Sequence, residues 1–93
     1  MYTKAAKITI YVSHANSLKD KRQVSKSIIE KTKHRFNISI AEVDTQEMVK
    51  TLTIGIAVVS GDVSYLKDYI SNVINYIEEN IDADVVGYEE YDI

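Results

Sequence analysis

The residue types from which enzymes build active sites are few and scattered in this chain of 93 residues. It has no cysteine, which excludes disulfides, thiolate metal sites and a cysteine nucleophile. The two histidines, His14 and His34, lack the spacing of a metal-binding pair, and no HExxH motif or third ligand accompanies them. The three glycines are dispersed and form no phosphate-binding loop. We therefore expect no catalytic residues, no metal site and no cofactor.

Four cationic side chains fall on one side of a segment with helical spacing. At about 100° per residue they lie within a sector roughly 60° wide: Lys19, Arg22, Lys26 and Lys33. Three cations also stand in the first turn of this helix, where the helix dipole disfavours positive charge. Clusters of Lys and Arg bind nucleic-acid phosphates, although a solvated helix flank has the same composition. We interpret the four residues, called the basic ridge below, as a candidate nucleic-acid or partner-binding surface.

A second polar constellation is predicted where the same helix begins. The helical angle of Lys21 places it on the apolar face, and Glu42 continues an alternating strand whose apolar residues face the helices. A right-handed strand–helix–strand connection brings Lys21 and Glu42 together, with His14 and Asp44 nearby. Such a cluster at the carboxyl ends of strands is either a small ligand site or an ion pair that seals the edge of the fold. We favour the ion pair.

The hydrophobic pattern predicts six elements that position these residues. Period-two alternation indicates strands over residues 8–12, 38–41, 51–58 and 85–91. Ser17 and Asp20 have capping-box spacing and begin a helix that we expect to end near Phe36 and Asn37, because Asn tolerates the left-handed backbone that terminates helices. Asp62 caps a second helix, whose apolar stripe follows at steps of three and four: Val63, Leu66, Ile70, Val73 and Ile77.

The order β-α-β-β-α-β is typical of the ferredoxin-like α+β fold. We expect a single domain over residues 1–93, with a four-stranded antiparallel sheet in the order 4-1-3-2 and both helices on one face. The other face, called the open sheet face below, then offers mostly small residues: Tyr11, Ala41, Thr53, Gly55 and Ala57. Only one of these is aromatic, which disfavours base stacking of the RNA-recognition type and favours self-association or protein docking.

The net charge of −3 hides a strong asymmetry between the two parts of the chain. Residues 1–35 hold nine Lys and Arg against two acids, whereas residues 36–93 hold two against twelve. The split indicates charged partners or two solvated faces of opposite sign. No apolar run approaches the roughly 20 residues that span a bilayer, and the first residues lack the apolar block of a signal peptide. We expect a cytoplasmic protein that does not bind membranes.

Three segments resemble the YlxP-like family of small bacterial proteins, and the likeness runs through nearly the whole chain. They are residues 17–22 (SLKDKR), 36–44 (FNISIAEVD) and 53–60 (TIGIAVVS). Ser25 and Thr32 stand where the family usually has a larger aliphatic residue, and the aromatic residue often found after the second strand is missing from residues 45–50. The resemblance implies a ferredoxin-like domain of unknown function, whose genes often lie near those for translation initiation and ribosome-maturation factors.

These observations lead to two functional hypotheses. The first is a non-catalytic accessory protein that binds ribosomal RNA or a ribosome-linked partner through the basic ridge. The alternative is a self-associating interaction module that forms a homo-oligomer through the open sheet face, with the basic part of one copy meeting the acidic part of another.

Overall fold

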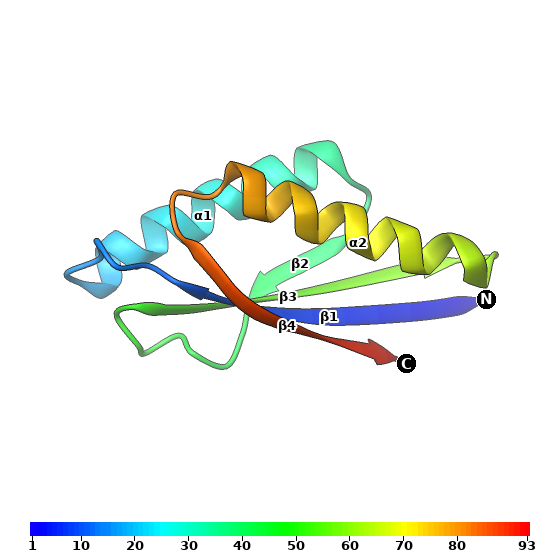
Figure 1. Ribbon diagram of the computed structural model, residues 1–93, viewed down its shortest axis with the longest axis horizontal. Helices are drawn as coiled ribbons and strands as arrows, with labels where there is room; N and C mark the ends of the chain where they lie inside the picture. The colour runs from blue at the N-terminus through cyan, green and yellow to red at the C-terminus, as the bar shows by residue number, and fades with distance from the viewer.

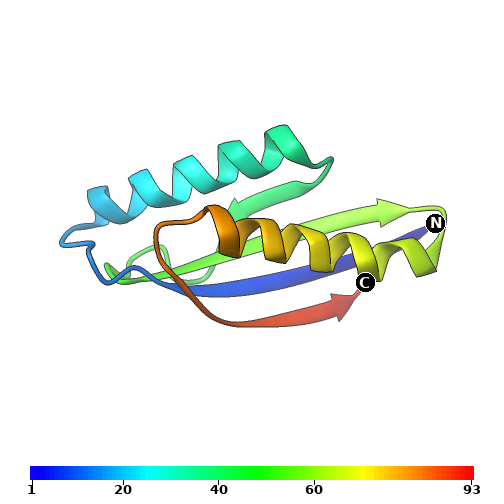
Figure 2. The same ribbon diagram turned by 45° about the horizontal axis from the view of Figure 1, so that its top comes forward.

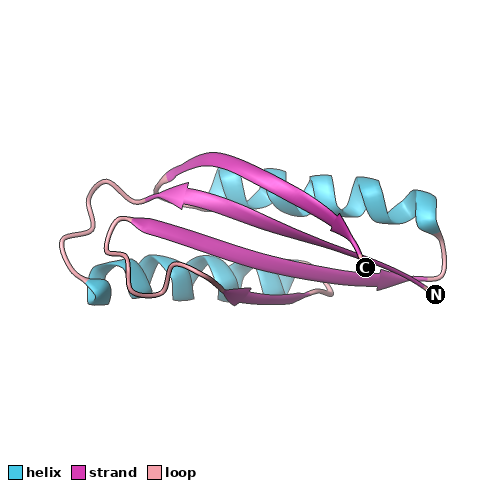
Figure 3. Cartoon of the chain, turned by 90° about the horizontal axis from the view of Figure 1, so that it is seen from below, coloured by secondary structure: helices cyan, strands magenta, loops and turns pink.

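The computed structural model describes residues 1–93, and its elements follow the predicted order (Figure 1). They are β1 (Tyr2–Tyr11), α1 (Leu18–Arg35), β2 (Ser39–Glu42), β3 (Thr51–Ser60), α2 (Val63–Asn80) and β4 (Asp84–Asp92). The sheet order is β2-β3-β1-β4 with antiparallel neighbours throughout, which is the predicted order counted from the other edge. Both helices cover one face of the sheet (Figure 2), and the view from below shows the strands with the helices behind them (Figure 3). The predicted ferredoxin-like fold is confirmed.

The core lies between the helices and the two central strands. In β1 and β3 the residues that point toward the helices alternate with those that point away, and the buried set includes Ile8, Ile10, Ile54 and Ile56. Ile8 stands opposite Ile54 in the register of the two strands. Such a period of two fixes register, because a shift by one residue would turn every apolar side chain toward the open face. The helices cover this layer with their own buried residues: Ile28, Leu66, Ile70, Val73, Ile74 and Ile77.

Side-chain caps begin both helices at the predicted residues. Ser17 Oγ accepts from the N–H of Asp20 at 3.1 Å, and Asp20 Oδ2 accepts from the N–H of Asn16 at 3.0 Å. Asp62 Oδ1 accepts from both the hydroxyl and the N–H of Ser64, and these bonds lower the pKa of the Asp62 carboxyl. An aspartate that is ionised at a helix N-terminus also complements the helix dipole.

Two sequence-based expectations about the helices were wrong in detail. The first helix ends at Arg35, close to the predicted end, but Phe36 follows in extended backbone at φ −127° and ψ 148°, and no left-handed residue terminates the helix. Val63 belongs to the predicted apolar stripe of α2 but is 60% exposed. It is the first residue of that helix and borders a surface pocket at the end of the sheet, so the stripe becomes buried only from Leu66 onward.

An aromatic cluster joins the end of α1 to α2. The ring of Phe36 lies 5.7 Å from that of Tyr69 and 5.4 Å from that of Tyr76, both edge to face. The Tyr69 hydroxyl accepts from the N–H of Asn37 at 2.9 Å, and the Arg35 guanidinium stands over the Tyr76 ring at 5.7 Å. Such contacts favour a fixed angle between the helices, so the outward-facing side of α1 has a defined direction.

Replacing Ile56 by Ala should lower the free energy of unfolding by about 2–5 kcal/mol, because it removes buried methylene groups and leaves a cavity. Ile56 is 3% exposed, whereas Val59, three residues along the same strand, is 59% exposed. The matched change Val59→Ala should therefore stay within about 0.5 kcal/mol. Urea denaturation of the three proteins measures both values, and equal losses at the two positions would contradict the strand parity.

Candidate functional site

The side chain of Lys21 is fully buried at the start of α1, at 0% exposure. Its ammonium donates three hydrogen bonds to backbone carbonyl oxygens: to Thr45 at 2.7 Å, to Gln46 at 3.2 Å and to Thr51 at 3.2 Å. An ammonium group has three N–H donors, so two carbonyls of the β2–β3 loop and the first carbonyl of β3 use all of them. The buried charge therefore fixes the conformation of residues 45–51 as well as its own place in the helix.

Glu42 supplies the opposite charge from the end of β2. Its Oε2 lies 3.0 Å from Lys21 Nζ, which confirms the contact predicted between these two residues. The same oxygen is buried and accepts no hydrogen bond, because the ammonium protons are directed at the carbonyls. Glu42 therefore stabilises Lys21 by charge rather than by a hydrogen bond. All three N–H donors of Lys21 are used by backbone carbonyls, so none remains to bind a ligand. The contact between Lys21 and Glu42 therefore fits an ion pair that stabilises the edge of the fold better than it fits a ligand site.

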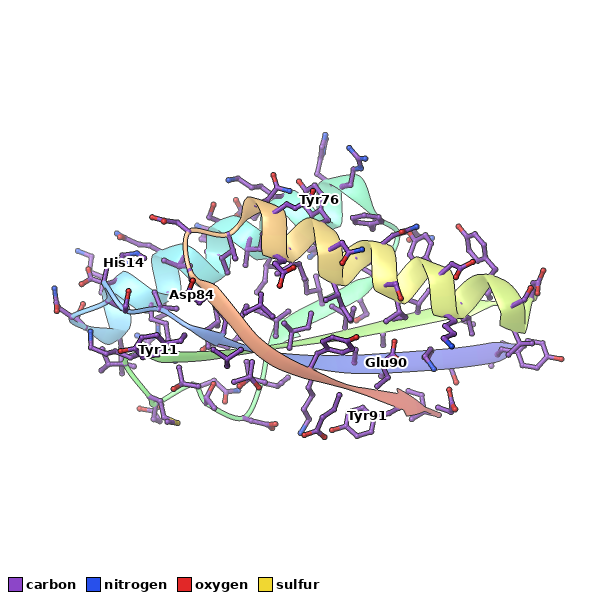
Figure 4. All side chains as sticks on the ribbon, in the orientation of Figure 1. Tyr11, His14, Tyr76, Asp84, Glu90 and Tyr91 are labelled. Carbon is purple, nitrogen blue, oxygen red and sulfur yellow. The ribbon has the colours of Figure 1, made fainter.

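The other two members of the predicted polar cluster lie elsewhere. Asp44 forms an ion pair with Lys7 at 2.6 Å, on the open sheet face. The expectation that Asp44 accompanies Glu42 assumed continued strand alternation, but β2 ends at Glu42 and Asp44 has a φ of 63°. This left-handed residue turns the chain, so the parity of the strand no longer applies. His14 is exposed in the loop before α1 and makes no hydrogen bond or ion pair with Lys21 or Glu42 (Figure 4).

A second lysine completes this end of the molecule, and it was missed from the sequence. Lys50, at the end of the β2–β3 loop, donates to the carbonyl oxygens of Ser13 at 2.6 Å and Ala15 at 2.8 Å. Lys21 thus holds the β2–β3 loop to α1, and Lys50 holds the same loop to the β1–α1 loop. Carbonyl acceptors have no side-chain signature, so only the unusual position of Lys21 on an apolar helix face pointed to this site.

The open sheet face is partly covered by the β2–β3 loop, which hangs below the sheet in Figure 1. Thr53 was expected to be open but is 5% exposed, because Thr45 Oγ1 donates to its hydroxyl at 2.9 Å. A Cβ at position 55 would lie 3.2 Å from Val43 Cγ1, so Gly55 leaves the room that Val43 occupies. The remaining small residues line a shallow groove beside this loop, and Tyr91 of β4 borders it: Ala5, Ser39, Ala41 and Ala57. Tyr11 is 43% exposed at the end of β1.

Charged groups divide this groove from the rest of the open face. The hydrogen bond to Asp44, followed by the charge of that carboxylate, raises the pKa of Lys7. Tyr91 donates to Glu89 Oε2 at 2.6 Å, and this bond raises the pKa of the Tyr91 phenol. Lys7 is thus paired with Asp44, and Tyr91 with Glu89, on the same face. None of these four side chains is left without a partner to act as a general acid or base.

All four residues of the basic ridge are exposed, and they face away from the second helix. The opposite flank of α1 borders a surface groove shared with the end of α2, which is lined by Val24, Ser27 and Lys31. At 100° per residue the ridge lies about 140° around the helix axis from that flank. It lies about 120° from the buried side that includes Lys21 and Thr32.

The main acidic residues lie on other elements. Glu78 and Glu79 belong to α2, and Glu89 and Glu90 belong to β4, which forms the opposite edge of the sheet from β2 (Figure 4 labels Glu90). Helix α1 contacts β2 and β3, whereas α2 contacts β1 and β3. On α1 itself, exposed Glu30 borders the ridge, and Glu42 at the end of β2 lies 3.0 Å from Lys21 at the start of the same helix. The acidic residues of α2 and β4 therefore lie on other elements than the ridge, whereas Glu42 lies close to its first turn.

The fold and these surfaces define a small ferredoxin-like domain with an ion-paired edge and an exposed cationic helix flank. Residues 4–90 match the family described as protein of unknown function (DUF503), and the chain belongs to that family. It is similar to the uncharacterized protein YlxP of Bacillus subtilis (strain 168), with 34% identity over 64 residues, 69% of this chain and 70% of that protein. This agrees with the resemblance seen in the sequence, and neither description names a reaction or a partner.

Among solved structures, the fold is similar to that of the de novo designed protein LFR1 1 with ferredoxin fold. The TM-score is 0.59 at 18% sequence identity, and the match covers 99% of this chain and 85% of the design. At this identity the likeness concerns the fold alone. Neither helix is long and apolar enough to cross a membrane.

Replacing Lys21 by Met should cost about 3–5 kcal/mol of unfolding free energy, because it leaves the Glu42 oxygen buried without a counter-charge and three carbonyls without a donor. Glu42→Gln should cost less, because the ammonium keeps its carbonyl partners. The double variant should cost less than the sum of the two single changes, since it removes the uncompensated charge.

The exposed pair of Lys7 and Asp44 provides the control for this cycle, because Lys7→Met makes the same chemical change outside the core. It should alter the midpoint of urea unfolding little. Single costs that simply add, or a Lys21→Met variant as stable as Lys7→Met, would contradict the coupled buried site.

Proposed function

We propose that this protein is a non-catalytic accessory protein of the cytoplasm that binds ribosomal RNA, or a ribosome-linked partner that carries phosphates, through the basic ridge. The observation that carries the proposal is the position of the ridge: four exposed cations on the flank of α1 that faces neither α2 nor β4. Phosphate backbones are bound by such Lys and Arg clusters. A protein with net charge −3 needs this separation, because its acids would otherwise repel a polyanion.

The absence of a catalytic role is part of the proposal and rests on the partners of the ionisable groups. Lys21, Glu42, Lys7 and Asp44 are paired with one another or with backbone carbonyls. His14 is exposed and has no base or acid bonded to it. A general acid or base needs a neighbour that orients it and brings its pKa near the working pH. The pairs Lys7–Asp44 and Tyr91–Glu89 instead raise the pKa of Lys7 and of Tyr91, away from neutral pH.

Reversing two ridge charges, Arg22→Glu with Lys26→Glu, should abolish co-sedimentation of the purified protein with ribosomal particles at low salt. The expected cause is electrostatic, because two phosphate contacts are lost and two repulsions are added. Urea unfolding should show that the variant keeps its stability within about 0.5 kcal/mol, since both residues are exposed on a helix.

The matched control is Lys31→Glu with Lys67→Glu, which changes the net charge by the same amount. Lys31 lies on the α2 side of α1, and Lys67 lies on α2. This variant should sediment with the particles as the native protein does. Equal loss in both variants would mean that only the net charge matters, and retention in both would refute the ridge as the binding surface.

Self-association through the open sheet face is the second candidate, and the groove of small residues beside Tyr91 favours it. Alanine side chains on a sheet allow another element to approach closely, and homo-oligomers commonly pair the same face of two copies. In this case Ala57→Lys should shift the mass in sedimentation equilibrium from oligomer to monomer, because it places a charge in the groove. A native protein that is monomeric at all concentrations would exclude this candidate.

A further inference from the structure

We infer that the ligand of the basic ridge is the phosphate backbone of double-stranded RNA, bound without contacts to the bases and therefore without sequence preference. The inference rests on the proposed function, and it names the form of RNA that the same four residues would bind. It follows from three properties of the ridge: its rigid spacing, the lack of Phe, Tyr and Trp side chains around it, and the number of its charges.

The ridge is held on a rigid scaffold. Lys19 and Lys33 are fourteen residues apart on one continuous helix, a distance of about 21 Å along its axis. The buried Lys21 and the aromatic contacts of Phe36 fix the rotation of α1 at its two ends. Charges at fixed positions bind best to phosphates at fixed positions, as in a duplex, whose wide minor groove is bordered by two backbone strands. A flexible single strand would lose conformational entropy in matching them.

Single strands are normally bound by stacking their bases on aromatic side chains, which compensates for that entropy. The exposed tyrosines lie on β1, α2 and β4, and neither α1 nor β2 has a Phe, Tyr or Trp residue; the one aromatic ring on α1 is the imidazole of exposed His34. Phe36, which directly follows α1, packs its ring against Tyr69 and Tyr76. The flank that carries the ridge therefore lacks the Phe, Tyr and Trp side chains on which several successive bases stack, and its long cationic side chains suit phosphates.

Counterion release gives the size of the expected preference. The logarithm of the binding constant falls with the logarithm of salt concentration by about 0.9 per phosphate contact on a duplex and about 0.7 on a single strand. For the four ridge residues the slopes are about −3.6 and −2.8. If the two forms bind equally at about 1 M salt, this difference corresponds to roughly sixfold tighter binding of the duplex at about 0.1 M salt, before any entropy of ordering the strand is counted.

The test uses a blunt RNA duplex, its two separated strands and a second duplex of shuffled sequence, each titrated with the full-length protein at several salt concentrations. We expect the first duplex to bind at least about sixfold tighter than either strand, with a slope near −3.6. The shuffled duplex should bind equally well. The Arg22→Glu, Lys26→Glu variant should bind neither duplex, and the Lys31→Glu, Lys67→Glu variant should bind both.

A variant that is expected to bind the duplex more tightly provides a further control, because loss of the fold could not produce tighter binding. Replacing Glu30 by Gln removes the exposed carboxylate of α1 that borders the ridge and should tighten duplex binding about twofold, as expected for one charge several ångströms away in water. Glu79→Gln makes the same change on α2 and should leave the affinity as it is.

The outcomes separate the inference from the proposed function on which it rests. Strands that bind as tightly as the duplex, or a strong preference between the two duplex sequences, would overturn the inference and leave RNA binding by the ridge in place. A native protein that binds none of the RNAs at low salt would overturn both.

Discussion

The buried ammonium of Lys21 is the interaction on which most of this structure depends. Taking a charge out of water costs several kcal/mol unless other groups compensate it. Here the compensation comes from two carbonyls of the β2–β3 loop, from the first carbonyl of β3 and from the Glu42 carboxylate. The loop between β2 and β3 therefore has to adopt the conformation that presents those carbonyls. Lys50, from the same loop, then bonds the β1–α1 loop, so a single buried charge organises three segments that are distant in sequence.

This constraint has consequences on both faces of the sheet. On the open side, the loop held by Lys21 covers Thr53 and places Val43 against Gly55, which leaves a groove of small residues beside the loop. On the helix side, Lys21 must point toward the loop, and this sets the rotation of α1 about its axis. The ridge residues are then directed outward, because they lie about 120° around the helix from the buried side. The buried Lys21 thus determines the direction in which the four exposed residues of the basic ridge point.

The two periodicities of the sequence explain what could be predicted. A period of two indicated the buried face of β1 and β3, and a period of 3.6 indicated the buried face of α1. The sheet order and the meeting of Lys21 with Glu42 followed once right-handed connections were added to these faces. The prediction for Asp44 was wrong because the alternation of faces ends with β2 at Glu42. Asp44, two residues later, has left-handed backbone and turns the chain. The covering of Thr53 depends on a loop whose acceptors are backbone carbonyls, and these carry no signal in the sequence.

The split of charge along the chain becomes a separation in space because of the fold. The cationic flank of α1 lies on the β2 side, and the acids of β4 lie at the other edge of the sheet. A molecule with this distribution is repelled by a polyanion in most orientations and attracted in one. Its net charge of −3 therefore does not argue against a phosphate-bearing partner; it restricts the encounter to the ridge and weakens non-specific contacts made by the rest of the surface.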